Sequence, residues 1–251
     1  MLKVHSLSVK LDNKIILNDI SFNVMSNDMF MIIGPNGSGK TTIVKAIMGD
    51  IKYTGNIELN NKNIKKISVS DISKQIGVLM QNHNLEFDNT VYDIVSLGRY
   101  TYIKDMFGKL SDTDKIMIEE AMELTDIKNL RHSSINSISG GELQRVFLAL
   151  VLAQDPDILI LDEPTNHLDL KHQIDIFDIL KKWSLKENKA IIAIIHDLNL
   201  VYKYASKSLL LKDGKIISCG DVKDSLTRET IKETYDIDIF EWMKTLLGNW
   251  K

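Results

Sequence analysis

The sequence has little cysteine and no apolar run long enough to cross a membrane. Cys219 is the only cysteine among 251 residues, which excludes an internal disulfide framework or zinc cluster and favours a reducing cytosol. As a lone thiol, Cys219 is expected to pack inside the protein. The longest apolar run, Val146–Ala153, falls far short of the roughly 20 residues that a spanning helix needs, and the first residues lack the apolar core of a signal peptide. We therefore expect any membrane attachment to come through a partner.

Neither sign of charge dominates, and no segment is repeated or of low complexity. The formal net charge is -3, from 31 lysine and arginine against 34 acidic residues, so nothing suggests a basic arm for nucleic acid. A chain of this length with 44% apolar residues can build a large core. Composition therefore predicts one compact, two-lobed unit that does not bind nucleic acid.

A glycine-rich stretch follows the short apolar run Met29–Ile33, which is typical of a buried strand. Its glycines allow backbone angles closed to other residues and bring N–H groups close to phosphate oxygens. A helix beginning near Lys40 adds its positive dipole end, Lys40 adds a charge, and Thr41 offers a hydroxyl to Mg²⁺. The predicted nucleotide-binding residues here are Gly34, Pro35, Asn36, Gly37, Ser38, Gly39, Lys40, Thr41 and Thr42.

Two acids end a second apolar run, Ile158–Leu161, which predicts a central strand of a parallel sheet. Ligands gather at the carboxyl ends of such strands. Asp162 is therefore a candidate ligand of Mg²⁺, directly or through water. Glu163 is a candidate base that accepts a proton from the attacking water.

Two further elements have both a structural and a functional interpretation. Ser139 with Glu142 three residues later forms a capping-box pattern, which by itself predicts only the start of a helix. His196 directly follows the apolar run Ala190–Ile195 and is therefore placed at a strand end. Taken alone, a single histidine is usually structural.

The order and spacing of these motifs, from about Leu7 to about Asp221, resemble the nucleotide-binding subunit of ABC transporters. The resemblance rests on the glycine loop, the Ser139–Arg145 element, Asp162–Pro164, the stretch Thr165–Asp169 and His196. It implies an ATPase in which two copies pair head to tail. ATP on the loop of one copy would then be enclosed by Ser139, Gly140, Gly141 and Glu142 of the other.

The resemblance also implies roles for single residues. His196 would contact the γ-phosphate and orient the attacking water, Gln81 would reach Mg²⁺, and Asp169 would couple the two sites across the dimer. One position departs from the family pattern, because Leu11 stands where an aromatic ring usually stacks on adenine. Stacked bases contribute about 1 to 3 kcal/mol, so Leu11 predicts a looser preference for ATP over GTP.

Residues outside the ATP chemistry resemble one group within the family. Thr90–Tyr100, Phe107-Gly108 and Asn166–Gln173 are similar to importers of the iron-siderophore, haem or cobalamin type. Arg99 and Tyr100 are expected to be exposed after a helix, either facing a permease or serving solubility alone. Partners implied are a second copy, transmembrane permease subunits and, indirectly, an extracytoplasmic substrate-binding protein, which places the chain on the cytoplasmic face of the membrane.

Two other interpretations remain open at this point. A soluble ABC-type ATPase acting in assembly, such as iron–sulfur cluster assembly, would share the same motifs. Soluble translation-type members generally carry two cassettes, whereas this chain has one loop and one Ser139–Glu142 element. A small-molecule kinase with a lone phosphate loop would leave that second element unexplained.

The predicted fold is α/β, with a P-loop NTPase core of mostly parallel sheet, an antiparallel β subdomain and a helical insertion. We expect a single ABC ATP-binding domain over 1–251, with the core and β subdomain in 1–88 and 154–222, a helical subdomain in 89–153 and a C-terminal extension in 223–251. Alternation predicts strands at Leu2–Val9 and Ile15–Val24, and Asp213-Gly214 predicts a hairpin turn. The apolar stretch Ile239–Leu247 predicts an amphipathic helix that either closes the core or contacts a dimer or permease partner.

Overall fold

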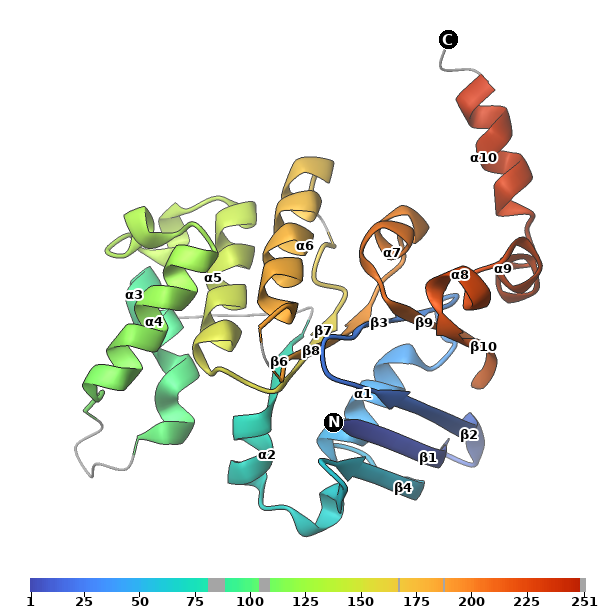
Figure 1. Cartoon of the computed structure of the whole chain (residues 1–251), viewed down its shortest axis with the longest axis horizontal. Coiled ribbons are helices and arrows are strands. Elements are labelled where there is room, and N and C mark those ends of the chain that lie inside the picture. The colour runs from blue at the N-terminus through green and yellow to red at the C-terminus, as the bar shows by residue number, and fades with distance from the viewer. Residues whose placement is uncertain (81–88, 104–108, 167, 187, 249–251) are drawn as a thin grey trace. The chain divides into compact units, whose positions relative to one another are not determined.

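The alternating segments near the N-terminus form an antiparallel sheet, as predicted. In the computed structural model, which describes residues 1–80, 89–103, 109–166, 168–186 and 188–248, β1 (Leu2–Leu11) lies between β2 (Lys14–Val24) and β4 (Thr54–Leu59) (Figure 1). A short fourth strand, β5 (Lys62–Asn63), completes the order β2-β1-β4-β5. The buried side chains of β1 alternate with exposed ones and change register at Ser6, whose φ is 48°. Such a bulge re-aims the following side chains without ending the strand.

The chain clusters into two compact units, residues 1–66 with 192–251 and residues 67–191. In the first unit, the fully buried strand β3 (Met29–Ile33) runs parallel to β9 (Lys207–Lys212), and β9 pairs antiparallel with β10 (Lys215–Asp221). The last residues of β8 (Ala190–Ile194) follow β3 in the order β10-β9-β3-β8. The helices of this unit are α1 (Lys40–Met48), the 3₁₀ turn η1 (Ile64–Lys66), α7 (Leu198–Tyr204), α8 (Val222–Ser225), α9 (Arg228–Tyr235) and α10 (Ile239–Gly248).

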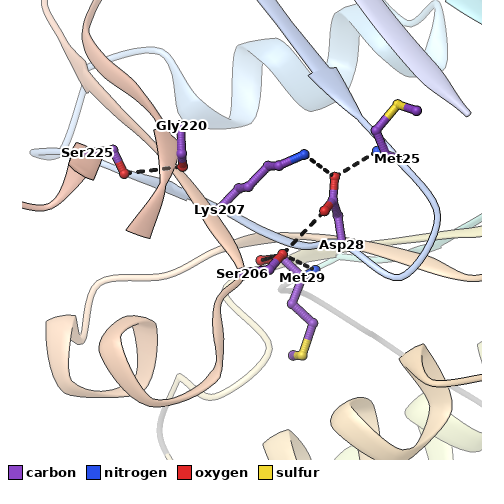
Figure 2. Close-up of polar contacts among 7 residues, drawn as sticks. All are labelled: Met25, Asp28, Met29, Ser206, Lys207, Gly220 and Ser225. Atoms are coloured by element: carbon purple, nitrogen blue, oxygen red, sulfur yellow. Dashed lines mark hydrogen bonds and ion pairs between the residues drawn. The ribbon is translucent and has the colours of Figure 1, made fainter. Parts of the chain in front are cut away.

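A buried carboxylate joins the starts of β3 and β9. Asp28, only 8% exposed, accepts hydrogen bonds from the Met25 N–H at 2.8 Å and from Lys207 Nζ at 3.0 Å (Figure 2). The Met29 N–H donates to Ser206 Oγ at 3.0 Å on the other side of the same carboxylate. Because a buried charge is stable only when it is paired, this cluster sets the register of the strand that leads into the glycine loop.

The second unit contains the remaining described strands and a further set of helices. Parallel strands β6 (Ile76–Leu79) and β7 (Ile158–Asp162) precede the first residues of β8 in the order β6-β7-β8. Its α-helices are α2 (Val69–Gln75), α3 (Val91–Ser96), α4 (Asp112–Leu124), α5 (Gly140–Ala153) and α6 (Leu170–Ser184). Three 3₁₀ segments connect them: η2 (Leu97–Tyr102), η3 (Lys128–Leu130) and η4 (Ile135–Ser137).

Arg99 is buried, which corrects the expectation that it lies exposed after a helix. Its guanidinium is 7% exposed, donates to Asp114 Oδ1 at 2.8 Å and to the Ala153 carbonyl at 2.9 Å, and stacks on the Tyr102 ring. The paired carboxylate lies fifteen positions along the chain, so the pairing could not be read from local sequence. Tyr100, by contrast, is 73% exposed, as expected.

Two further expectations about packing are wrong. Cys219 lies exposed on β10 and does not pack inside the protein. The predicted C-terminal helix forms as α10, yet none of its residues is buried, so it does not close the core. Phe240 and Trp242 on this helix are 41% and 60% exposed. The alternative, contact with a partner, stays a prediction.

Candidate functional site

The glycine loop, residues 34–39, connects β3 to α1 in the first unit. Gly39 is the N-cap of α1 with φ 107°, and a Cβ there would lie 2.6 Å from Leu17 Cδ2, so this position requires glycine. The helix has no side-chain cap and no acid in its first turn. Its first N–H groups and the positive end of its dipole are therefore available to an anion.

The turn between β9 and β10 is hydrogen-bonded to this loop. The Gly214 N–H donates to the Ser38 carbonyl at 3.0 Å, and the Gly214 carbonyl accepts from the Asn18 N–H at 2.8 Å. Gly214 has φ 72°, and a side chain there would overlap the carbonyl of Ile16. The Asp-Gly pair predicted the turn, but no sequence signal pointed to its contact with the glycine loop.

The side chains of the loop suit a phosphate chain. Lys40 is 6% exposed, and its Nζ donates to the carbonyls of Gly34 at 2.8 Å and Pro35 at 2.9 Å, which places the ammonium inside the loop. Ser38 Oγ is buried and has no hydrogen-bond partner in the described part of the chain. Thr41 and Thr42 are half-buried in the first turn of α1. A buried cation and an unpaired hydroxyl in a glycine cradle fit a polyphosphate.

His196 and Leu11 are also residues of the first unit. The Ile195 N–H donates to the Ile32 carbonyl at 3.2 Å, so the residue after β8 sits beside the end of β3, where the glycine loop begins. His196 is exposed there. Leu11 ends β1 opposite Lys14 and is 43% exposed, as a residue must be to contact a ligand.

The acidic pair belongs to the second unit. All five residues of β7 are buried, including Asp162 at 5% exposure, and Glu163 follows in a left-handed conformation with φ 54°. A non-glycine residue pays strain for this conformation, and the surrounding structure must hold it there. Asn166 does so in part, because its Nδ2 donates to Glu163 Oε2. The strand end was predicted, whereas the positive φ and the Asn166 contact were not.

The capping box at the start of α5 is confirmed. Ser139 Oγ and the Ser139 N–H contact Glu142 Oε2 at 2.7 and 2.8 Å, and the Glu142 N–H returns a hydrogen bond to Ser139 Oγ at 3.3 Å. Hydrogen bonds from Ser139 lower the pKa of Glu142 below its ordinary value. Ser139 and Gly140 remain exposed, and a Cβ at Gly140 would meet nothing within 4 Å. The turn is therefore open to an approaching molecule.

Asp169 caps α6. Its Oδ1 accepts from the His172 N–H at 2.9 Å and lies 2.7 Å from His172 Nδ1. These two contacts lower the pKa of Asp169 and keep its carboxylate ionised. Gln81 lies outside the described residues, as do Phe107 and Gly108 of the importer-like stretch. The sequence-predicted site residues thus fall into two groups, one in each unit.

Comparison with known proteins identifies the family of this chain. Residues 17–166 match the family model described as ABC transporter. The iron(3+)-hydroxamate import ATP-binding protein FhuC of Bacillus subtilis is 34% identical over 238 residues, covering 94% of this chain and 88% of that protein. The ferric enterobactin transport ATP-binding protein FepC of Escherichia coli is 33% identical over 223 residues, covering 88% and 82%.

Solved structures show the same similarity. A transporter of the metal-chelate type in an inward-facing conformation superposes with a TM-score of 0.82 at 26% identity, over 94% of this chain and 88% of that chain. A dimeric post-hydrolysis ATP-binding cassette bound to ADP and Pi gives 0.75 at 26% identity, over 88% and 99%.

The glycine loop, the acid-terminated strand and the capped Ser-Gly-Gly turn are those of a P-loop ATPase with the ABC fold. The chain belongs to the ABC transporter family, as one of its ATP-hydrolysing, ATP-binding subunits. The predicted fold class and the resemblance to ATP-binding subunits of the siderophore importer group are confirmed. Among the described residues, no helix combines the length and the apolar character that crossing a membrane requires.

Proposed function

We propose that this subunit hydrolyses ATP in a head-to-tail dimer and thereby powers uptake of a metal chelate of the iron-siderophore, haem or cobalamin type. The observation that supports the dimer is the open turn at Ser139 and Gly140. This turn begins helix α5, and a Cβ at Gly140 would meet nothing within 4 Å. A helix N-terminus supplied by a partner stabilises phosphate charge only after association. The names of the relatives support the class of cargo.

The residues of one active site divide the chemistry. The glycine loop and Lys40 hold the phosphates, Glu163 accepts the proton of the attacking water, and His196 orients that water. Bound Mg²⁺ supplies positive charge to the phosphate oxygens, and its proposed protein ligands are Thr41, Gln81 and Asp162. Leu11 of the chain that binds ATP contacts the base. The second copy contributes Ser139, Gly140, Gly141 and Glu142 to the same site, and Asp169 couples the two sites of the dimer.

The proposed assembly has further members. Two copies of this chain bind two transmembrane permease subunits at the cytoplasmic face of the membrane, and an extracytoplasmic binding protein delivers the chelate to the permease. Closure of the dimer on ATP and reopening after hydrolysis then move the permease between its outward and inward states.

A complementation experiment tests the dimer. Lys40→Ala disables the loop, and Gly140→Asp places a carboxylate where the partner's phosphates would approach, at a position where an added Cβ meets nothing within 4 Å. Neither variant alone should hydrolyse ATP. An equal mixture regains one intact site in each mixed dimer, or about a quarter of the normal rate. Full activity of Gly140→Asp alone, or no recovery on mixing, contradicts the proposal.

Two controls complete this experiment. A chain with both substitutions, mixed with Lys40→Ala, offers no intact site and should stay inactive. Transport is tested separately, by uptake of radiolabelled hydroxamate-bound iron, haem and cobalamin in cells lacking the chain, and by capture of membrane partners with the tagged protein. If cells lacking the chain took up all three compounds normally, and the tagged protein captured only soluble partners, an ATPase acting in assembly would be favoured.

A further inference from the structure

Residues 139–141, here called the signature turn, are in contact with the first turn of α6 through His172. A Cβ at Gly141 would lie 2.6 Å from His172 Cδ2 and 2.8 Å from Nε2, so the edge of the imidazole rests directly against the backbone of α5. His172 belongs to the first turn of α6. Any side chain larger than hydrogen at Gly141 would have to displace this ring.

The other edge of the ring is held by Asp169. The carboxylate Oδ1 lies 2.7 Å from His172 Nδ1 and also accepts the His172 N–H at 2.9 Å. An ionised carboxylate accepts only, so Nδ1 carries the hydrogen, and the edge formed by Cδ2 and Nε2 faces Gly141. The imidazole thus has one fixed orientation, with Asp169 on one side and Gly141 on the other.

A second connection runs parallel to the first. Gln144, one turn into α5, donates from Nε2 to the Pro164 carbonyl at 2.8 Å, directly after Glu163. Gln173, beside His172, donates to the carbonyls of Leu168 at 3.1 Å and Thr165 at 3.4 Å. The start of α5 is therefore held to Pro164 directly through Gln144, and to Asp169 through the His172 ring.

We propose that His172 is a positioning residue that holds Gly141 and Asp169 of one subunit in a fixed relation, so that both surfaces meet the partner copy as one rigid element. The inference rests on the proposed head-to-tail dimer. In that dimer the chain that donates the signature turn is the one that needs its own His172. The chain that donates the glycine loop does not depend on its His172 for the same site.

The first test separates chemistry from nucleotide binding. His172→Ala removes the ring, and we expect kcat for ATP to fall by about tenfold because the signature turn loses its support, while KM changes by less than twofold. His172→Phe keeps the ring against Gly141 but loses the bond to Asp169, and should fall between. Lys171→Ala, exposed on the same turn, should leave the rate unchanged. A normal kcat for His172→Ala overturns the inference.

The second test uses the mixed dimers, in which Lys40→Ala is the signature donor and Gly140→Asp is the loop donor. Adding His172→Ala to the signature donor should lower the recovered rate by about tenfold, and adding it to the loop donor by less than twofold. Equal losses in both arrangements would mark His172 as merely structural and overturn the inference. If either chain fails to fold, as judged by thermal unfolding, His172→Phe replaces it. No recovery in the parent mixture, without any change at His172, would instead overturn the proposed dimer and the inference with it.

Discussion

The contact between the β9–β10 turn and the glycine loop predicts that a change far from the ATP motifs will weaken nucleotide binding. Gly214→Ala introduces a side chain at φ 72°, a conformation that costs an L-residue about 1 to 2 kcal/mol. The new Cβ also overlaps the Ile16 carbonyl, so the turn must move. Moving it breaks the hydrogen bonds to Ser38 and Asn18, worth about 1 kcal/mol each. We expect a loss of about 3 to 4 kcal/mol in the free energy of unfolding.

The functional effect follows from the same displacement. Ser38 loses the support of its carbonyl, so the glycine cradle is no longer held in the geometry that meets phosphate oxygens. ATP affinity, measured by isothermal titration calorimetry at a temperature where the variant is folded, should fall by about tenfold, or 1.4 kcal/mol. Unfolding is followed in parallel by urea titration with circular dichroism.

Gly248→Ala is the matched control. Gly248 ends α10 without a positive φ, and the same added Cβ there would meet nothing within 4 Å. This variant should bind ATP normally and unfold near the normal urea concentration. If Gly214→Ala matched it in both measurements, the reasoning that the turn supports the loop would be refuted.

Three other predictions follow from single side chains. Glu163→Gln should retain ATP binding but lose hydrolysis and accumulate a closed dimer, because an amide cannot accept the proton; sustained turnover in a phosphate-release assay would remove Glu163 from its role. Leu11→Tyr should bind ATP more tightly by about 1 to 3 kcal/mol and sharpen discrimination against GTP, and unchanged ATP and GTP affinities would show that Leu11 does not contact the base. Asp114→Asn should cost about 3 kcal/mol, since Arg99 is left buried without its counter-charge. Burial raises the pKa of Asp114, but hydrogen bonds from Ser111 and Arg99 outweigh it and lower the pKa, so its stabilising effect is present above about pH 4 and is lost as the pH falls through the lowered value. The variant should accordingly lose less stability than the normal protein between neutral and acidic pH in thermal unfolding, and equal acid sensitivity would contradict this.

Local patterns predicted the elements that carry the site. The continuous apolar runs of β3 and β7 indicated buried strands, and the residues that follow them indicated phosphate and metal chemistry. The Ser139–Glu142 spacing indicated a capped helix, which the structure confirms. The predictions of the two strands and of the capped helix succeeded because hydrophobic periodicity and backbone angles depend on near neighbours in the chain.

Local patterns did not predict the contacts between segments that are distant in the sequence. Arginine is usually a surface residue, and Arg99 is buried because Asp114 and the Ala153 carbonyl accept its hydrogen bonds. Cys219 has the character of a packing residue, yet it lies on the exposed part of β10. Burial depends on what the folded chain places beside a residue, and neither residue type nor spacing specifies that neighbour.

The sequence by itself determined the functional motifs of this protein, namely the phosphate loop, the acid pair and the capped turn, and the strands and helices that carry them. Only the tertiary structure decided how these parts are supported, with Gly214 beneath the loop and His172 between Gly141 and Asp169. A motif is defined by residue types a few positions apart in the chain. The contacts that hold a motif in place come from the packing of segments that are far apart in the sequence.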